Sequence, residues 1–66
     1  MPSVEKRLAR LSGRTSREAW VELERVKQHA NFYELLEHLE KKDGALLIRD
    51  VERAVKRFLN AHKDQH

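Results

Sequence analysis

Apolar residues recur along this chain at spacings of three and four, which is the pattern of amphipathic helices. The clearest case lies near the C-terminal end, where the apolar positions cover an arc of roughly 140° on a helical projection. We predict a helix over 45–61 there, with a frayed tail at 62–66. The apolar residues of this helix are Leu47, Ile48, Val51, Ala54, Val55, Phe58 and Leu59.

A short helix is expected at the N-terminal end, over 3–11. Ser3 can cap its first turn, because a serine hydroxyl accepts a hydrogen bond from an early backbone N–H. Gly13 follows the last apolar residue and favours a turn there. One face of this helix holds its three large apolar residues, Val4, Leu8 and Leu11.

A second helix is expected over 16–30. Thr15 and Glu18 have the spacing of a capping box, in which the threonine caps the helix and the glutamate reaches back to it. The apolar positions then change phase at Asn31, which predicts a third helix over 32–42 with Asn31 as its N-cap. A single helix with a kink near Asn31 is the alternative for these two segments.

Together these segments predict an all-α fold, a single domain of three or four helices over 1–66. A chain of 66 residues buries only about 60% of its unfolded surface, so we expect a small stability that is raised by forming a homodimer. Trp20 lies beside the apolar seam of the second helix, which suits a second chain or the first helix. Val21 points away from the seam. We predict both as interface residues.

The composition excludes several classes of site. There is no cysteine, which rules out disulfides and thiol chemistry and favours an intracellular, cytoplasmic protein. The longest apolar run, 45–48, is far shorter than the ~20 residues that span a membrane, so we expect no membrane association. His62 and His66 have the spacing of a metal-binding pair but lack a third ligand, and we expect no metal and no cofactor.

No pattern in the chain points to catalysis. The serine and threonine residues are accounted for by helix caps and turns, and the carboxylates fall at solvated helix positions. So short a chain also has little core in which to bury a substrate. We therefore predict a protein that acts by binding and is not an enzyme.

Basic residues carry the main functional hypothesis, since the net charge is +3 and the pI is near 9.6. A stripe on the last helix lies opposite the apolar arc and can follow a phosphate backbone. The alternative is a solvated face with an ion pair between Glu52 and Lys56. A second basic set, on the first helix and the turn after it, joins the stripe only if the fold places both on one side. The candidate nucleic-acid-binding residues are Lys6, Arg10, Arg14, Arg17, Arg49, Arg53, Lys56 and Arg57.

The segment from Ala9 to Glu22 resembles a DNA-binding helix-turn-helix in that Ala9 precedes the turn glycine, Gly13, by four residues and a new helix follows. Arg14 and Glu22 stand where that motif has apolar packing residues. The stretch 11–19 is also similar to the inter-helix turn of ribbon-helix-helix antitoxins, but the DNA-reading strand of that family is absent from the sequence. We assign the chain to neither family.

These observations predict a small intracellular regulatory or adaptor protein, with DNA or RNA as the preferred ligand. An acidic protein partner also fits the basic stripe. The alternative function is a homodimeric protein–protein interaction module with no role at nucleic acids. The two hypotheses differ in their salt dependence, because binding through phosphates weakens steeply as salt rises.

Overall fold

The structure is a computed structural model that describes residues 3–63. These residues form four α-helices and the turns between them. No strand is formed within these residues, so the prediction of an all-α, three- or four-helix fold is confirmed. The helices are α1 (Val4–Ser12), α2 (Arg17–Val26), α3 (Phe32–Glu40) and α4 (Ile48–Ala61).

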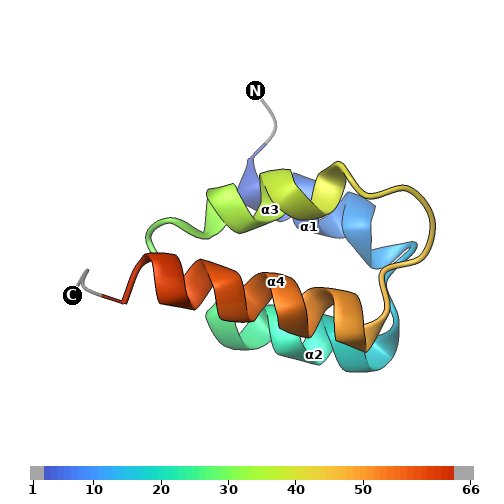
Figure 1. Cartoon of the computed structure of the whole chain (residues 1–66). Coiled ribbons are helices and arrows are strands. Elements are labelled where there is room, and N and C mark those ends of the chain that lie inside the picture. Colours follow the sequence, from blue (N-terminus) through green and yellow to red (C-terminus); the bar gives the residue numbers. More distant parts are fainter. Residues whose placement is uncertain (1–2, 64–66) are drawn as a thin grey trace.

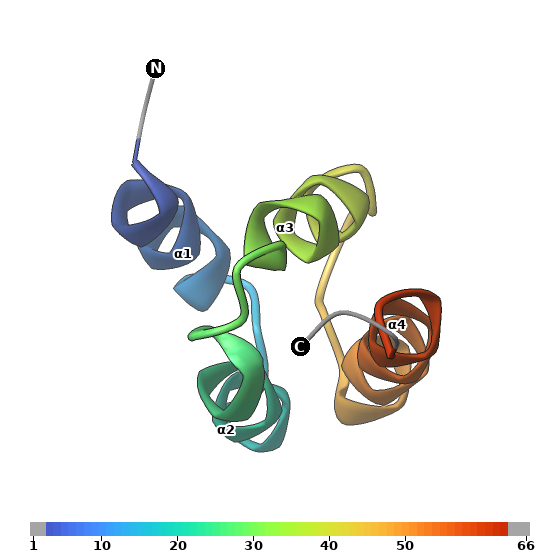
Figure 2. The same cartoon turned by 90° about the vertical axis from the view of Figure 1, so that its left-hand side faces the viewer.

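The helices are arranged as two hairpins, α1–α2 and α3–α4, whose turns lie at the same end of the molecule (Figure 1). Helices α1 and α3 pack against each other in one layer, and α2 and α4 pack against each other in the second. Seen from the end, the four helices occupy four corners, with α1 diagonally across from α4 (Figure 2). Because α4 also packs against α3, its exposed residues lie on the outer corner of the unit.

The two hairpins are joined where their turns meet. The Ser16 N–H donates to the Leu46 carbonyl (2.9 Å), and the Leu46 N–H donates to the Arg14 carbonyl (2.8 Å), forming an isolated parallel bridge. Leu46 is fully buried, so its side chain ties the second turn to the core. The same turn requires Gly44, whose φ of 82° lies in the left-handed region that favours glycine.

The buried core of the described residues is wholly apolar. Helix α3 contributes four residues to it, whereas α1 contributes Leu11 alone, with Leu8 packed at the edge. Trp20 and Val26 of α2 are partly buried against the same cluster. The buried residues are Leu11, Ala19, Leu23, Phe32, Leu35, Leu36, Leu39, Leu46, Val51, Ala54, Val55 and Phe58.

Helix α2 begins at Arg17, one residue later than its capping-box pattern predicts. Ser16 is the N-cap, and its hydroxyl accepts a hydrogen bond from the Ala19 N–H at 3.2 Å. The Thr15 hydroxyl instead donates to the Leu11 carbonyl at 2.5 Å, so the prediction of Thr15 as the cap is wrong. The physical reason is the bridge to Leu46, because the Ser16 N–H donates to the Leu46 carbonyl and the extended backbone of Ser16 stays outside the helix.

The break between α2 and α3 is wider than predicted. Helix α2 ends at Val26, and residues 27–31 form turns, so the two segments are separate helices and not one kinked helix. Asn31 is the N-cap of α3 by position, but its side chain makes no cap hydrogen bond. The Asn31 amide nitrogen lies 3.2 Å from Nδ1 of His62. Helix α3 then ends at Glu40, before the predicted end at residue 42.

Helix α4 begins at Ile48, later than the predicted start at residue 45. The physical reason is again the bridge between the turns, which takes up Leu46 before the helix can start. Asp50 accepts a hydrogen bond from the Leu47 N–H at 3.1 Å and so closes the first turn of the helix.

The C-terminal end of α4 is held by His62. Its Nε2 lies 2.5 Å from a carboxylate oxygen of Glu34, and its ring packs against that of Phe58, with centroids 4.9 Å apart. The ring of His29 lies beside both. The prediction of a frayed tail is therefore wrong at His62, and residues 64–66 of that tail lie outside the described residues.

Candidate nucleic-acid interface

Helix α4 presents a row of cations on the face opposite the core. All four side chains are exposed, and within residues 3–63 none of them makes an ion pair. In particular, the Glu52–Lys56 pair that would mark an ordinary solvated face does not form. No carboxylate of the described residues therefore lies within ion-pair distance of this row. The row consists of Arg49, Arg53, Lys56 and Arg57.

The packing of α3 against α4 adds further cations beside this row. A cleft of about 430 Å³ opens where the chain leaves α3 and returns along α4. Two lysines line it from the α3 side and two arginines from the α4 side, so positive charge faces positive charge across it. We call it the basic cleft, and its lining residues are His38, Leu39, Lys41, Lys42, Asp50, Arg53 and Arg57.

Asp50 is the carboxylate of the basic cleft, and its oxygens are already engaged. One accepts from the Leu47 N–H, and the other lies 3.7 Å from the ammonium of Lys42. The backbone hydrogen bond and the nearby charges of Lys42 and Arg49 hold the pKa of Asp50 below its ordinary value. Asp50 therefore stays ionised at neutral pH and offsets one of the four cations, which leaves the cleft positively charged.

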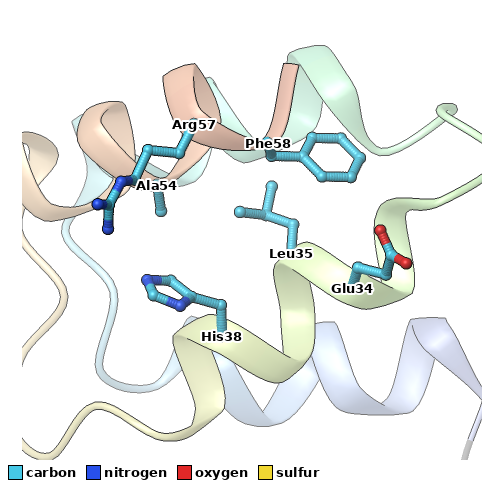
Figure 3. Close-up of a pocket in the computed structure, with 6 residues that line it drawn as sticks. All are labelled: Glu34, Leu35, His38, Ala54, Arg57 and Phe58. Carbon is cyan, nitrogen blue, oxygen red and sulfur yellow. The ribbon is translucent and has the colours of Figure 1, made fainter. Parts of the chain in front are cut away.

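An apolar pocket of about 230 Å³ adjoins the basic cleft along the same α3–α4 seam. The side chains of Arg57 and His38 reach from facing helices at one end of it, and Leu35 and Phe58 lie at its centre (Figure 3). His38 and Arg57 line both the pocket and the cleft, so the two hollows lie next to each other. The lining residues of the apolar pocket are Glu34, Leu35, His38, Ala54, Arg57 and Phe58.

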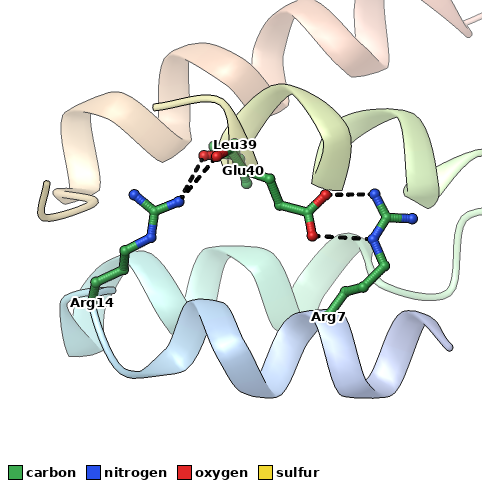
Figure 4. Close-up of polar contacts among 4 residues, drawn as sticks. All are labelled: Arg7, Arg14, Leu39 and Glu40. Atoms are coloured by element: carbon green, nitrogen blue, oxygen red, sulfur yellow. Dashed lines mark hydrogen bonds and ion pairs between the residues drawn. The ribbon is translucent and has the colours of Figure 1, made fainter. Parts of the chain in front are cut away.

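Arg14, a predicted nucleic-acid contact, is instead half buried against the end of α3. Its guanidinium donates to the carbonyls of Lys42 and Gly44, and more weakly, at 3.4 Å, to those of Leu39 and Glu40 (Figure 4). The last carbonyls of a helix lack hydrogen-bond partners within the helix. A cation there also interacts favourably with the negative end of the helix dipole. Arg14 thus caps α3 and positions the turn that carries Lys42.

A second arginine joins the same two helices. The Arg7 guanidinium donates to both carboxylate oxygens of Glu40, at 2.6 and 3.1 Å (Figure 4). This paired hydrogen bond holds the pKa of Glu40 below its ordinary value and raises that of Arg7. Together with Arg14, it fixes α1 along the side of α3.

The remaining basic residues of the first set lie outside the basic cleft. Lys6 and Arg10 are exposed on α1, which lies diagonally across the unit from α4 (Figure 2). Arg17 begins α2 and lines a separate, shallow depression beside Arg49. The structure therefore joins the α4 row to the basic cleft and places Arg17 beside Arg49, whereas Lys6 and Arg10 do not line the cleft.

The two predicted interface residues differ in exposure. Trp20 is half buried and packs against the core of its own chain, so the partial burial of its ring is explained without a second chain. Val21 is 57% exposed on the outer face of α2.

The sequence reasoning missed His38, Lys41 and Lys42 as parts of the site. Two lysines at a helix end are expected because they interact favourably with the helix dipole. That expectation gave no reason to consider them as part of a binding site. The available signal was the short, glycine-containing turn after them, because such a turn folds the chain back and brings the lysines near the start of α4.

In the described part of the chain, no group of three or more His, Cys, Asp or Glu side chains is placed to hold a metal ion, and His66 lies outside that part. None of the described helices is long and apolar enough to cross a bilayer. Comparison of the chain with protein-family models, with curated proteins and with solved structures gave no match. Functional inference therefore depends on the site itself.

Proposed function

We propose that this chain is a small intracellular regulatory or adaptor protein that binds nucleic acid through α4 and the basic cleft. The observation that carries the proposal is the meeting of cations from α4 and from the turn after α3 around a cleft of about 430 Å³. Its carboxylate, Asp50, is already hydrogen-bonded and offsets only part of that charge. The absence of cysteine supports an intracellular location.

The row on α4 suits a phosphate backbone. Arg49, Arg53 and Arg57 follow one another at four-residue intervals, which places their Cα atoms about 6 Å apart along the helix axis. An arginine fork can hold two oxygens of one phosphate, and a lysine adds a compact point charge. One strand of phosphates can thus meet several of these cations, and each contact releases condensed counterions.

The test is a pair of charge-reversed variants with the same change in net charge. Arg53→Glu with Arg57→Glu alters the proposed interface, and Lys6→Glu with Arg10→Glu alters exposed cations on α1. Affinity for DNA and RNA is measured at low salt by fluorescence anisotropy, with circular dichroism as a check of folding. We expect the first variant to lose binding and the second to retain most of it.

Two results would overturn the proposal. One is wild-type protein that retains neither DNA nor RNA at low salt. The other is an Arg53→Glu/Arg57→Glu variant that is folded and binds as well as the α1 control. A milder variant refines the outcome, because Arg53→Ala removes one phosphate contact and should lower the slope of log K against log salt by about 0.9 for duplex DNA and about 0.7 for a single strand.

A homodimeric protein-interaction module is the second candidate, and the exposed Val21 favours it. A large apolar side chain that is 57% exposed on α2 suits a contact between two copies or with another protein. Dimerisation through α2 is compatible with nucleic-acid binding through α4, since the two surfaces do not share residues. An acidic protein partner would occupy the basic cleft in place of nucleic acid.

A further inference from the structure

The apolar pocket next to the basic cleft indicates which form of nucleic acid fits this surface. A phosphate-binding row alone needs no hollow beside it, yet the α3–α4 seam continues from the cleft into a pocket of about 230 Å³. Leu35, Ala54 and Phe58 line this pocket with apolar atoms. His38 and Arg57 stand where the two hollows meet (Figure 3).

We propose that the apolar pocket receives an unpaired base whose phosphate lies in the basic cleft, so that the chain prefers single-stranded DNA or RNA to duplex. This inference rests on the proposed function. A nucleotide joins a flat, weakly polar base to a charged phosphate, and the seam joins an apolar hollow to a cationic one in the same way. Arg57, at the junction, is placed to hold the phosphate that precedes or follows the base.

His38 supplies the flat surface on which such a base can stack. It is exposed at the rim of the pocket and lines the cleft as well, so an imidazole ring stands beside the path from phosphate to base. Proteins that read single strands commonly stack unpaired bases on aromatic or histidine rings. Glu34 lines the far end of the pocket, and one of its carboxylate oxygens lies 2.5 Å from Nε2 of His62.

Duplex DNA does not offer this combination, because its bases are stacked inside the helix and reach a pocket only if they are flipped out. Electrostatics alone would favour the duplex, which carries the higher charge density and releases more counterions per contact. A preference for the single strand would therefore report the pocket and not the cations.

The experiment compares four probes of about 12 nucleotides, a length within the range covered by small single-strand-binding folds. They are an oligothymidine, an oligouridine, an abasic deoxyribose-phosphate strand and a duplex, each measured by anisotropy at the same low salt. We expect the oligothymidine and oligouridine to bind at least about 5-fold more tightly than the abasic strand, since one stacked base is worth roughly that much or more. The duplex should also bind more weakly than either.

Two variants of the exposed His38 test the stacking surface without disturbing the core. His38→Ala should remove most of the preference for the oligothymidine over the abasic strand, whereas His38→Phe keeps a ring and should preserve it. Lys6→Ala on α1 is the matched surface control and should leave the preference unchanged. Circular dichroism confirms that each variant is folded.

The outcomes separate the inference from the proposed function. If no probe binds, the proposed function fails and the inference with it. If the abasic strand or the duplex binds as tightly as the oligothymidine, the chain is a phosphate-binding protein that does not use its pocket, and the inference alone is overturned. The same holds if a folded His38→Ala keeps the full preference for bases.

Discussion

Removal of the Arg14 guanidinium should destabilise the chain far more than removal of an exposed arginine on the preceding helix, α1. Arg14→Met keeps the length of the side chain and deletes its donors. The loss leaves carbonyls at the end of α3 and in the following turn without the partner that they have now, among them those of Lys42 and Gly44. The carbonyls of Lys42 and Gly44 belong to the turn between α3 and α4, which also carries Leu46. Loss of the Arg14 hydrogen bonds should therefore also weaken the bridge at Leu46.

The magnitude follows from the contacts. A hydrogen bond to a charged group contributes about 1.5–3 kcal/mol, and of the four Arg14 contacts the one to the Gly44 carbonyl, at 3.0 Å, has the ordinary length. Water reaches this half-buried group and replaces part of what is lost, so we expect a decrease of about 2–3 kcal/mol in the free energy of unfolding. In a chain of 66 residues each kcal/mol lowers Tm by roughly 4–8 °C, which gives a total of about 8–24 °C.

The assay is thermal unfolding followed by circular dichroism at neutral pH. The control is Arg10→Met, an exposed change on α1 that should alter stability by about 0.5 kcal/mol or less. Arg14→Lys separates charge from geometry, because an ammonium keeps the charge but cannot bond several carbonyls in the way a planar guanidinium does. We expect it to recover less than half of the loss. Equal melting temperatures for Arg14→Met and Arg10→Met would refute this account of Arg14.

Two further predictions concern pH and assembly. The pKa values of Glu40 and Asp50 are lowered in the folded chain, so both carboxylates add stability above their unfolded pKa values and lose it as pH falls through the folded ones. Tm should therefore drop between about pH 5 and pH 2, and less steeply in a Glu40→Gln/Asp50→Asn variant. Parallel plots of Tm against pH for the two proteins would contradict the role given to these carboxylates. If Val21 lies in a homodimer interface, Tm should rise with protein concentration and Val21→Glu should abolish that rise; a monomeric mass by light scattering with a concentration-independent melt would exclude the dimer.

Local patterns predicted the helices well where the apolar stripe was strong. Of the apolar residues predicted to face the core from α4, Val51, Ala54, Val55 and Phe58 are buried, whereas Leu47 and Leu59, at its two edges, are exposed. The helix starts were less accurate, because the bridge between Thr15 and Leu46 draws residues from both turns out of the helices. That bridge joins segments far apart in the sequence, and no capping pattern reports it.

The candidate site was predicted only in part for a similar reason. The exposure of the α4 row follows from its helix periodicity alone, so the sequence was sufficient for it. The role of Arg14 depends on the position of the α3 carbonyls, which lie more than twenty residues further along the chain. Likewise, Lys41 and Lys42 become part of a cleft only once α4 packs against α3.

The parallel bridge between the two turns has a consequence for the order of folding. Each hairpin can close over a short loop, whereas the bridge must bring together two turns separated by all of α2 and α3, and the entropy of closing a loop grows with its length. We therefore expect the bridge to form late, after the hairpins. Because Lys42 and Gly44 lie in the turn that the bridge anchors, we expect the basic cleft to form only in the final stage of folding. A ligand bound in the cleft would then stabilise only the fully folded chain.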